Sequence, residues 1–134
     1  MTPPDRPPAA DPQAWLDHAR SNLVLAKNRI PGVRLGDLCF NAQQAAEKAL
    51  KGLLASRKAD VPLTHDLSHV LAIIEETGIA IPVHVLDAAR LSPYAVGPRY
   101  PETETAKDVP VSPTAYAMAV DIAQRVIEWV ESVI

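Results

Sequence analysis

An alanine- and leucine-rich segment from about residue 34 to residue 58 constrains the fold of this chain more than any other feature. Its apolar residues recur at spacings of three and four, the period of one helical face: Leu35, Leu38, Ala42, Ala45, Ala49 and Leu53. Four more apolar residues widen that face: Cys39, Ala46, Leu50 and Leu54. At 1.5 Å per residue the helix would be about 37 Å long. A face this wide needs neighbours on more than one side, so the segment predicts the central helix of a bundle.

Capping and breaking residues divide the rest of the chain into further helices. Asp11 is a good N-cap and Pro12 suits a first helical turn, so a helix should begin there and stop at Pro31-Gly32. The same logic places a third helix from residues 64–66 to Gly78, a short fourth helix opened by Pro82, and a last helix opened by Ser112-Pro113.

No segment alternates apolar and polar residues over a strand's length, so the prediction is an all-α, antiparallel, up-and-down bundle of four to five helices. The 134 residues suit one domain, from residue 12 to residue 134. Proline is too dense in residues 1–11 for helix or sheet, so a disordered tail is expected there. A second proline-rich stretch, Ser92–Val111, is predicted to be irregular, and such long loops are usually functional or disordered.

Compartment and charge give weaker guidance. The chain has a single cysteine, no apolar run near 18 residues and no signal-like stretch, so a cytoplasmic protein without membrane attachment is expected.

Residues 20–58 hold eight basic and two acidic residues, a net +6, whereas residues 59–134 hold four basic and eleven acidic residues, a net −7. Either the two halves face each other and partly neutralise, or the basic half attracts phosphates or an acidic partner.

A polar stripe crosses the predicted central helix. Asn41, Gln44, Lys48 and Lys51 fall on one helical face, and Glu47 can pair with Lys51 four residues on. Two lysines with amide side chains would suit a phosphate or a nucleotide. The alternative is a solvated face.

Two other stretches hold residues with possible chemistry. His65 and His69 have a metal-compatible spacing, but no further ligands stand out, so no metal or cofactor is predicted and His65 is expected to pack against the central helix. In residues 94–101, YAVGPRYP, Tyr94 and Tyr100 could stack on a base beside Arg99, or they could plug the end of the bundle. Cys39 lies within the apolar stripe and is interpreted as a small core residue.

Three elements in this order resemble the HEPN domain family. Residues 40–54, FNAQQAAEKALKGLL, are similar to the family's central helix. Thr64-His65-Asp66-Leu67 is similar to the start of its next helix, and Arg99-Tyr100-Pro101 is similar to its ARYP loop. The resemblance covers roughly Trp15 to Ile134.

The resemblance implies an antiparallel helical bundle that is often homodimeric and often encoded beside a minimal nucleotidyltransferase, as in toxin–antitoxin-like pairs. Some members bind nucleotides and many are metal-independent ribonucleases. The ribonuclease branch carries an Arg followed after four to six residues by His. This sequence has no such pair, since no histidine follows Arg99 and none of the four histidines has an Arg at that distance before it.

The sequence therefore predicts a non-catalytic HEPN binding module. It would form a homodimer, hold a minimal nucleotidyltransferase or bind a nucleotide or RNA. The expected ligand-binding residues are Asn41, Gln44, Lys48, Lys51, His65, Tyr94, Arg99 and Tyr100. A ribonuclease toxin with a non-standard site and a purely structural oligomerisation bundle are the alternatives.

Overall fold

The computed structural model describes residues 11–95 and 111–134. In these two ranges the chain is all-α, with five α-helices, one 3₁₀ helix and no strand. The elements are α1 (Pro12–Lys27), α2 (Leu35–Ser56), α3 (Leu67–Glu76), α4 (Val83–Leu86), the 3₁₀ helix η1 (Asp87–Ala95) and α6 (Pro113–Val133). The predicted tail, residues 1–11, lies outside the described residues except for Asp11.

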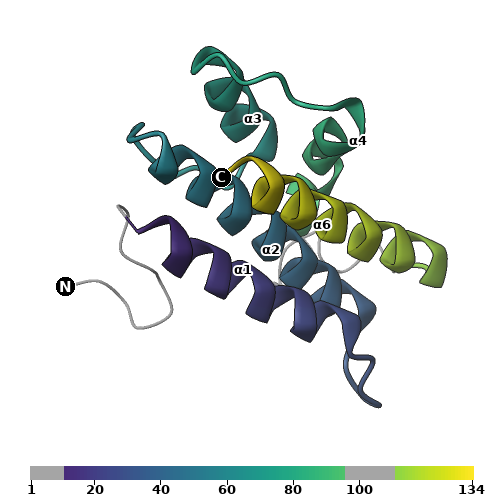
Figure 1. The fold of residues 1–134 in the computed structure, drawn as a ribbon. Helices are drawn as coiled ribbons and strands as arrows, with labels where there is room; N and C mark the ends of the chain where they lie inside the picture. Colours follow the sequence, from purple (N-terminus) through teal and green to yellow (C-terminus); the bar gives the residue numbers. More distant parts are fainter. Residues whose placement is uncertain (1–10, 96–110) are drawn as a thin grey trace.

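The three long helices lie side by side, and α3 and α4 cover one side of them (Figure 1). Helix α1 runs antiparallel to α6, because Arg20 pairs with Glu131 near the end of α6 while Ala26 meets Tyr116 near its start. Helix α2 packs against α1, α3, η1 and α6. The prediction that this helix is the centre of an all-α bundle is confirmed.

Three helices begin at capping residues: α1 and α6 at the caps expected from the sequence, and α3 at Asp66, one of the two candidates that the sequence offered with Thr64. The side chain of Asp11 accepts hydrogen bonds from the backbone of Gln13 and Ala14, with Pro12 in the first turn. Asp66 caps α3 through Ser68, and Ser112 caps α6 through Ala115. In each case the side-chain oxygen accepts a hydrogen bond from a backbone N–H group that has no acceptor within the helix.

Two helix ends differ from the prediction. Helix α1 ends at Lys27, not at Pro31-Gly32, because Asn28 adopts an extended backbone and its side chain donates to the carbonyl of Val24 at 2.6 Å. Gly32 then supplies the positive φ of the turn. The stretch expected to be irregular from Ser92 is helical as far as Ala95, where η1 ends, and residues 96–110 lie outside the described part of the chain.

Small residues let α1 and α2 approach closely. Ala19 and Ala26 on α1 are fully buried, as are the four alanines in the middle of α2: Ala42, Ala45, Ala46 and Ala49. At Gly52 an added Cβ would lie 2.9 Å from Trp15 Cβ and 3.3 Å from the carbonyl oxygen of Pro12. The lack of a side chain at this position therefore sets the spacing between the two helices.

Replacing Gly52 by alanine should destabilise the protein by up to about 2 kcal/mol. Alanine is worth about 1 kcal/mol more than glycine in an open helix, but overpacking costs about 1–3 kcal/mol, and the clash here is with backbone and Cβ atoms. Urea denaturation of both proteins measures the difference. A gain in stability for Gly52→Ala would show that α1 and α2 lie farther apart.

Candidate functional site

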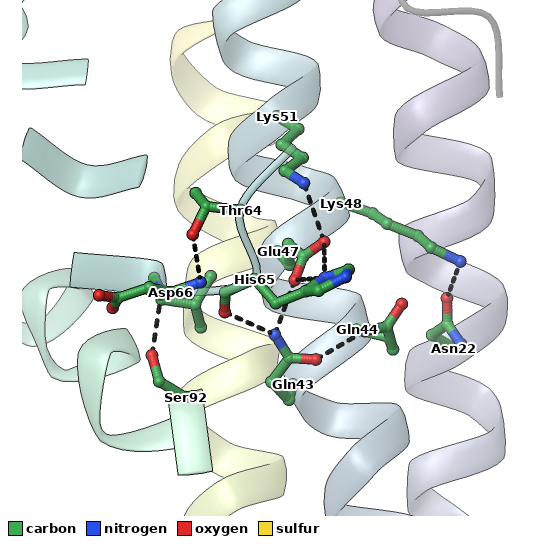
Figure 2. Close-up of polar contacts among 11 residues, drawn as sticks. Asn22, Gln43, Gln44, Glu47, Lys48, Lys51, Thr64, His65, Asp66 and Ser92 are labelled. Atoms are coloured by element: carbon green, nitrogen blue, oxygen red, sulfur yellow. Dashed lines mark hydrogen bonds and ion pairs between the residues drawn. The ribbon is translucent and has the colours of Figure 1, made fainter. Parts of the chain in front are cut away.

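Three polar side chains lie buried on α2, although the other buried residues of this helix are apolar. Gln43, Glu47 and Lys51 are 0%, 3% and 4% exposed. Buried polar groups are costly unless their hydrogen bonds are made within the protein. The three side chains form the centre of the network in Figure 2, which also reaches α1 and the segment before α3.

The carboxylate of Glu47 is the hub of this network. Its Oε2 accepts a hydrogen bond from Lys51 Nζ at 3.0 Å, and its Oε1 accepts one from Gln43 Nε2 at 2.8 Å. The Nδ1 atom of His65 lies 3.0 and 3.1 Å from the two oxygens. The predicted pairing of Glu47 with Lys51 is confirmed, and it is an internal ion pair that compensates the charge of both groups.

The turn before α3 sets the position of His65. The backbone N–H of Asp66 donates to Thr64 Oγ1 at 3.0 Å, and the backbone N–H of Leu67 donates to Ser92 Oγ at 2.9 Å. The carbonyl of His65 accepts from Gln43 Nε2 at 3.4 Å. These bonds hold the backbone on both sides of the imidazole, so the predicted packing of His65 against α2 is confirmed.

The imidazole of His65 is oriented but accessible. Its side chain is 53% exposed, whereas the Glu47 side chain that faces Nδ1 is 4% exposed. A carboxylate partner favours the proton on Nδ1, so that Nε2 of the neutral ring is an acceptor. This orientation presents one ring nitrogen at the surface of the bundle.

A second polar row joins α2 to α1. Lys48 Nζ donates to Asn22 Oδ1 at 3.0 Å, and Asn22 Nδ2 donates to Asn41 Oδ1 at 3.0 Å. Beside them, Gln44 Nε2 donates to Gln43 Oε1 at 2.7 Å, which links this row to the Glu47 network. Asn41, Gln44 and Lys48 are half-buried.

The predicted polar stripe therefore separates into two parts. Asn41 and Lys48 contact Asn22 of α1, whereas the contacts with the segment before α3 are made by the adjacent Gln43 and Glu47 (Figure 2). Asn41, Gln44, Lys48 and His65 keep accessible surface, whereas Lys51 is buried against Glu47. A direct contact between Lys51 and a ligand would require this ion pair to open.

Tyr94 extends the site along α2. It lies on η1, half-buried, and its side chain is close enough to Cys39, one turn before Gln43, for each group to affect the pKa of the other. Arg99 and Tyr100 lie outside the described residues. Tyr94 is thus placed near the Gln43 end of the network, while the predicted roles of Arg99 and Tyr100 in ligand binding stay predictions.

Cys39 and Tyr94 are both poor acids here. Burial raises the pKa of the Cys39 thiol to about 11, and the hydrogen bond with Tyr94 acts in the opposite direction. Burial also raises the pKa of the Tyr94 hydroxyl, as does the neighbouring Cys39. Because the thiolate is the nucleophile, the interpretation of Cys39 as a core residue agrees with its full burial.

Native Cys39 should react with a disulfide reagent at pH 8 at least about 100-fold more slowly than the same thiol in urea, because burial removes both access and thiolate. Absorbance of the thiolate released from the reagent follows the reaction. Equal reaction rates in native buffer and in urea would contradict the burial of Cys39.

The raised pKa of Cys39 also makes the stability of the fold depend on pH. The protonated thiol favours folding below its ordinary pKa, and this contribution is lost as pH rises toward about 11.

Asn22 and the central role of Glu47 were not predicted from the sequence. Gln43 and Glu47 follow Cys39 at intervals of four residues, in a row of the helix that is expected to be buried. Two polar residues in such a row could have indicated a buried hydrogen-bond network. Asn22 is separated from Lys48 by 26 positions and carries no local signal.

Within residues 11–95 and 111–134, no three His, Cys, Asp or Glu side chains gather as a metal site would require. An open pocket of about 640 Å³ lies apart from the Glu47 network, between the start of α1 and the end of α2. Its walls are largely apolar: Pro12, Ala55, Ser56, Lys58, Ala59, Asp60 and Val61. No helix in the described part of the chain is both long enough and apolar enough to cross a membrane.

Comparison with known proteins identifies relatives over nearly the whole chain. The HEPN domain model matches residues 12–133. The structure of TT1696 from Thermus thermophilus is 32% identical, covers 90% of this chain and 96% of its own, and has a TM-score of 0.77. The structure of ST0689, described as an archaeal HEPN homologue, is 26% identical, covers 91% and 96%, and has a TM-score of 0.70. No curated protein matches the sequence.

Proposed function

Because this chain belongs to the HEPN domain family, we propose that it is a non-catalytic binding module that takes a nucleotide at the face formed by Asn41, Gln44, Lys48 and His65. The module acts as a homodimer and pairs with a minimal nucleotidyltransferase in a toxin–antitoxin-like system. The main support for this proposal is the position of Lys48 beside the Glu47–Lys51 ion pair.

The charge of this face supports a phosphate ligand. Lys48 brings a second ammonium group to this face, one position along α2 from Glu47 of the Glu47–Lys51 ion pair. The hydrogen bond from Lys48 Nζ to Asn22 holds that ammonium at the seam of α1 and α2. The amide of Gln44 and the ring of His65 add polar groups that can contact a base or a sugar.

The lack of the ribonuclease motif supports a role without catalysis. An imidazole is the usual acid or base near neutral pH. The chain has no histidine after Arg99, where the HEPN ribonuclease motif would place one.

Calorimetric titration with ATP and GTP tests whether the protein binds a nucleotide. Wild-type protein should release or absorb heat, and Lys48→Gln should bind about tenfold or more weakly, because one charge-assisted phosphate contact is worth at least about 1.5 kcal/mol. Lys58→Gln, which removes an exposed lysine at the end of α2, is the matched control and should bind as wild type. No heat at millimolar nucleotide would remove the nucleotide from the proposal.

Co-expression tests the protein partner. A minimal nucleotidyltransferase encoded beside this gene should co-purify with the tagged protein, and light scattering of the protein alone should give the mass of a dimer. A monomer mass would contradict the homodimer, and a nucleotidyltransferase that elutes separately would contradict the partner.

A second candidate function is cleavage of RNA at a non-standard site. It is favoured by one observation, the accessible imidazole of His65 held by the buried carboxylate of Glu47. A carboxylate that orients an imidazole is a common arrangement for a general base. Purified protein would then cleave RNA, and His65→Ala would abolish cleavage. Equal cleavage by wild type and His65→Ala would identify a contaminating nuclease.

A further inference from the structure

The turn between α1 and α2 forms a distinct surface at one end of the bundle, where the two helices project together (Figure 1). We call this surface the hairpin tip and define it by seven exposed residues: Val24, Leu25, Lys27, Arg29, Ile30, Val33 and Arg34. None of them belongs to the Glu47 network or to the proposed nucleotide face. Lys48 lies about 20 Å along α2 from the first residue of that helix.

Exposed aliphatic side chains are concentrated on the hairpin tip. Among the described residues, eight large apolar side chains are exposed, and four of them lie between positions 24 and 33. Their exposed fractions are 60% for Val24, 52% for Leu25, 57% for Ile30 and 40% for Val33. Single exposed apolar residues are ordinary, but a continuous group of them marks an interaction site.

The hairpin tip is also purely basic. From position 18 to position 36 the sequence contains four basic residues and no acidic residue. Arg20, the first of the four, is neutralised by Glu131 at 2.7 Å and by Asp17 at 3.2 Å. In the part of the chain that the structure describes, no acidic side chain pairs with Lys27, Arg29 or Arg34. The expectation that the basic half is neutralised by the acidic half is therefore met at Arg20 and not at the tip.

The hairpin tip is held in one conformation by α6. The hydroxyl of Tyr116 donates to the carbonyl of Ala26 at 2.6 Å and is buried. The guanidinium of Arg29 lies 5.8 Å from the centre of the Tyr116 ring, within the range of a cation–π contact. The side chain of Asn28 closes the end of α1. A surface fixed in this way loses little conformational entropy when a partner binds.

We infer that the hairpin tip is the docking surface for the protein partner, and that the partner presents an acidic face with an apolar centre. This inference rests on the proposed function, since it assigns the surface that the nucleotidyltransferase would contact. The three cations of the tip supply charge complementarity, which accelerates association, and the four aliphatic side chains supply the apolar area that a stable interface needs.

Two other kinds of occupant fit the hairpin tip less well. Single-stranded nucleic acid is held by stacking on aromatic side chains, and the tip exposes none. Anionic membranes are recognised by clusters of about four to eight basic residues with interfacial aromatic residues, whereas the tip has three cations and no aromatic residue of its own.

Two variants of the full chain test the inference with the co-expressed nucleotidyltransferase. Ile30→Asp places a charge in the apolar centre, and the double variant Lys27→Glu/Arg34→Glu reverses the charge without touching the Arg29–Tyr116 contact. Val83→Asp is the matched control, because Val83 is 80% exposed on α4. All of these positions are exposed, and circular dichroism with a thermal melt confirms folding.

Both tip variants should bind the nucleotidyltransferase about 30-fold or more weakly than wild type, the size of a hot-spot loss, and Val83→Asp should bind as wild type. Wild-type binding should also weaken with added salt. Equal binding by all four proteins, or a loss confined to Val83→Asp, would overturn the assignment of the docking surface but not the proposal of the partner.

If the wild type does not bind the nucleotidyltransferase, both the proposed partner and the proposed docking surface are overturned. Tip variants that instead lose affinity for RNA or for phosphatidylserine vesicles would assign the surface to those ligands and overturn the inference.

Discussion

Replacing Glu47 by alanine is expected to lower the free energy of unfolding by about 3–5 kcal/mol, the loss typical of breaking a buried ion pair. Glu47 is 3% exposed, and its carboxylate receives hydrogen bonds from Lys51, Gln43 and the imidazole of His65. Removal of the carboxylate takes away the counter-charge of Lys51, a residue that is 4% exposed. Urea denaturation followed by circular dichroism measures the change.

Two controls separate the buried charge from other effects of the Glu47→Ala substitution. The double variant Glu47→Leu/Lys51→Leu removes both charges and should recover most of the lost stability, since apolar replacement of a buried pair is often neutral or stabilising. Glu131→Ala removes the partner of Arg20 in an exposed pair and should cost at most about 1 kcal/mol. A loss below about 1 kcal/mol for Glu47→Ala would show that water reaches the network.

Replacing Leu50 by alanine should destabilise the protein by about 2–5 kcal/mol, because the lost side chain leaves a cavity that the neighbouring helices fill only in part. Leu50 is fully buried in the middle of α2, which packs against α1, α3, η1 and α6. Leu63→Ala is the same substitution at a side chain that is 82% exposed, and it should change stability by less than about 0.5 kcal/mol. Equal effects at the two positions would contradict the central place of α2 in the core.

The helical core could be predicted from the sequence because its signals are local. The spacing of three and four from Leu35 to Leu53 identified the buried face of α2, the caps at Asp11 and Ser112 identified the starts of α1 and α6, and the start of α3 was placed within residues 64–66. Each of these signals depends on residues within one or two turns of each other.

The arrangement of the candidate site could be predicted only in part because its contacts are not local. The Glu47–Lys51 pair is separated by one turn and was expected, whereas the contacts of Glu47 with His65 and of Lys48 with Asn22 cross 18 and 26 positions. Helical spacing placed Asn41, Gln44, Lys48 and Lys51 on one face, but it could not show that Asn22 of α1 contacts that face or that His65 contacts the adjacent Glu47.

Helix α2 thus holds both the core and the candidate site. Its alanines and Gly52 let α1 approach, and this close packing brings Asn22 within 3.0 Å of Lys48. One position before Lys48, Glu47 fixes the imidazole of His65. The groups proposed to bind a nucleotide therefore owe their positions to packing and to buried hydrogen bonds, so changes in the core should also weaken binding.

Nuclear magnetic resonance of the ¹⁵N-labelled protein during titration with ATP tests the central claim most directly. The proposal predicts shifts that saturate and that are concentrated at the amide signals of Gln44, Lys48 and His65, with little change at Ile30 and Val33 of the hairpin tip. No shift at millimolar ATP, or shifts concentrated at the hairpin tip, would contradict a nucleotide site on α2.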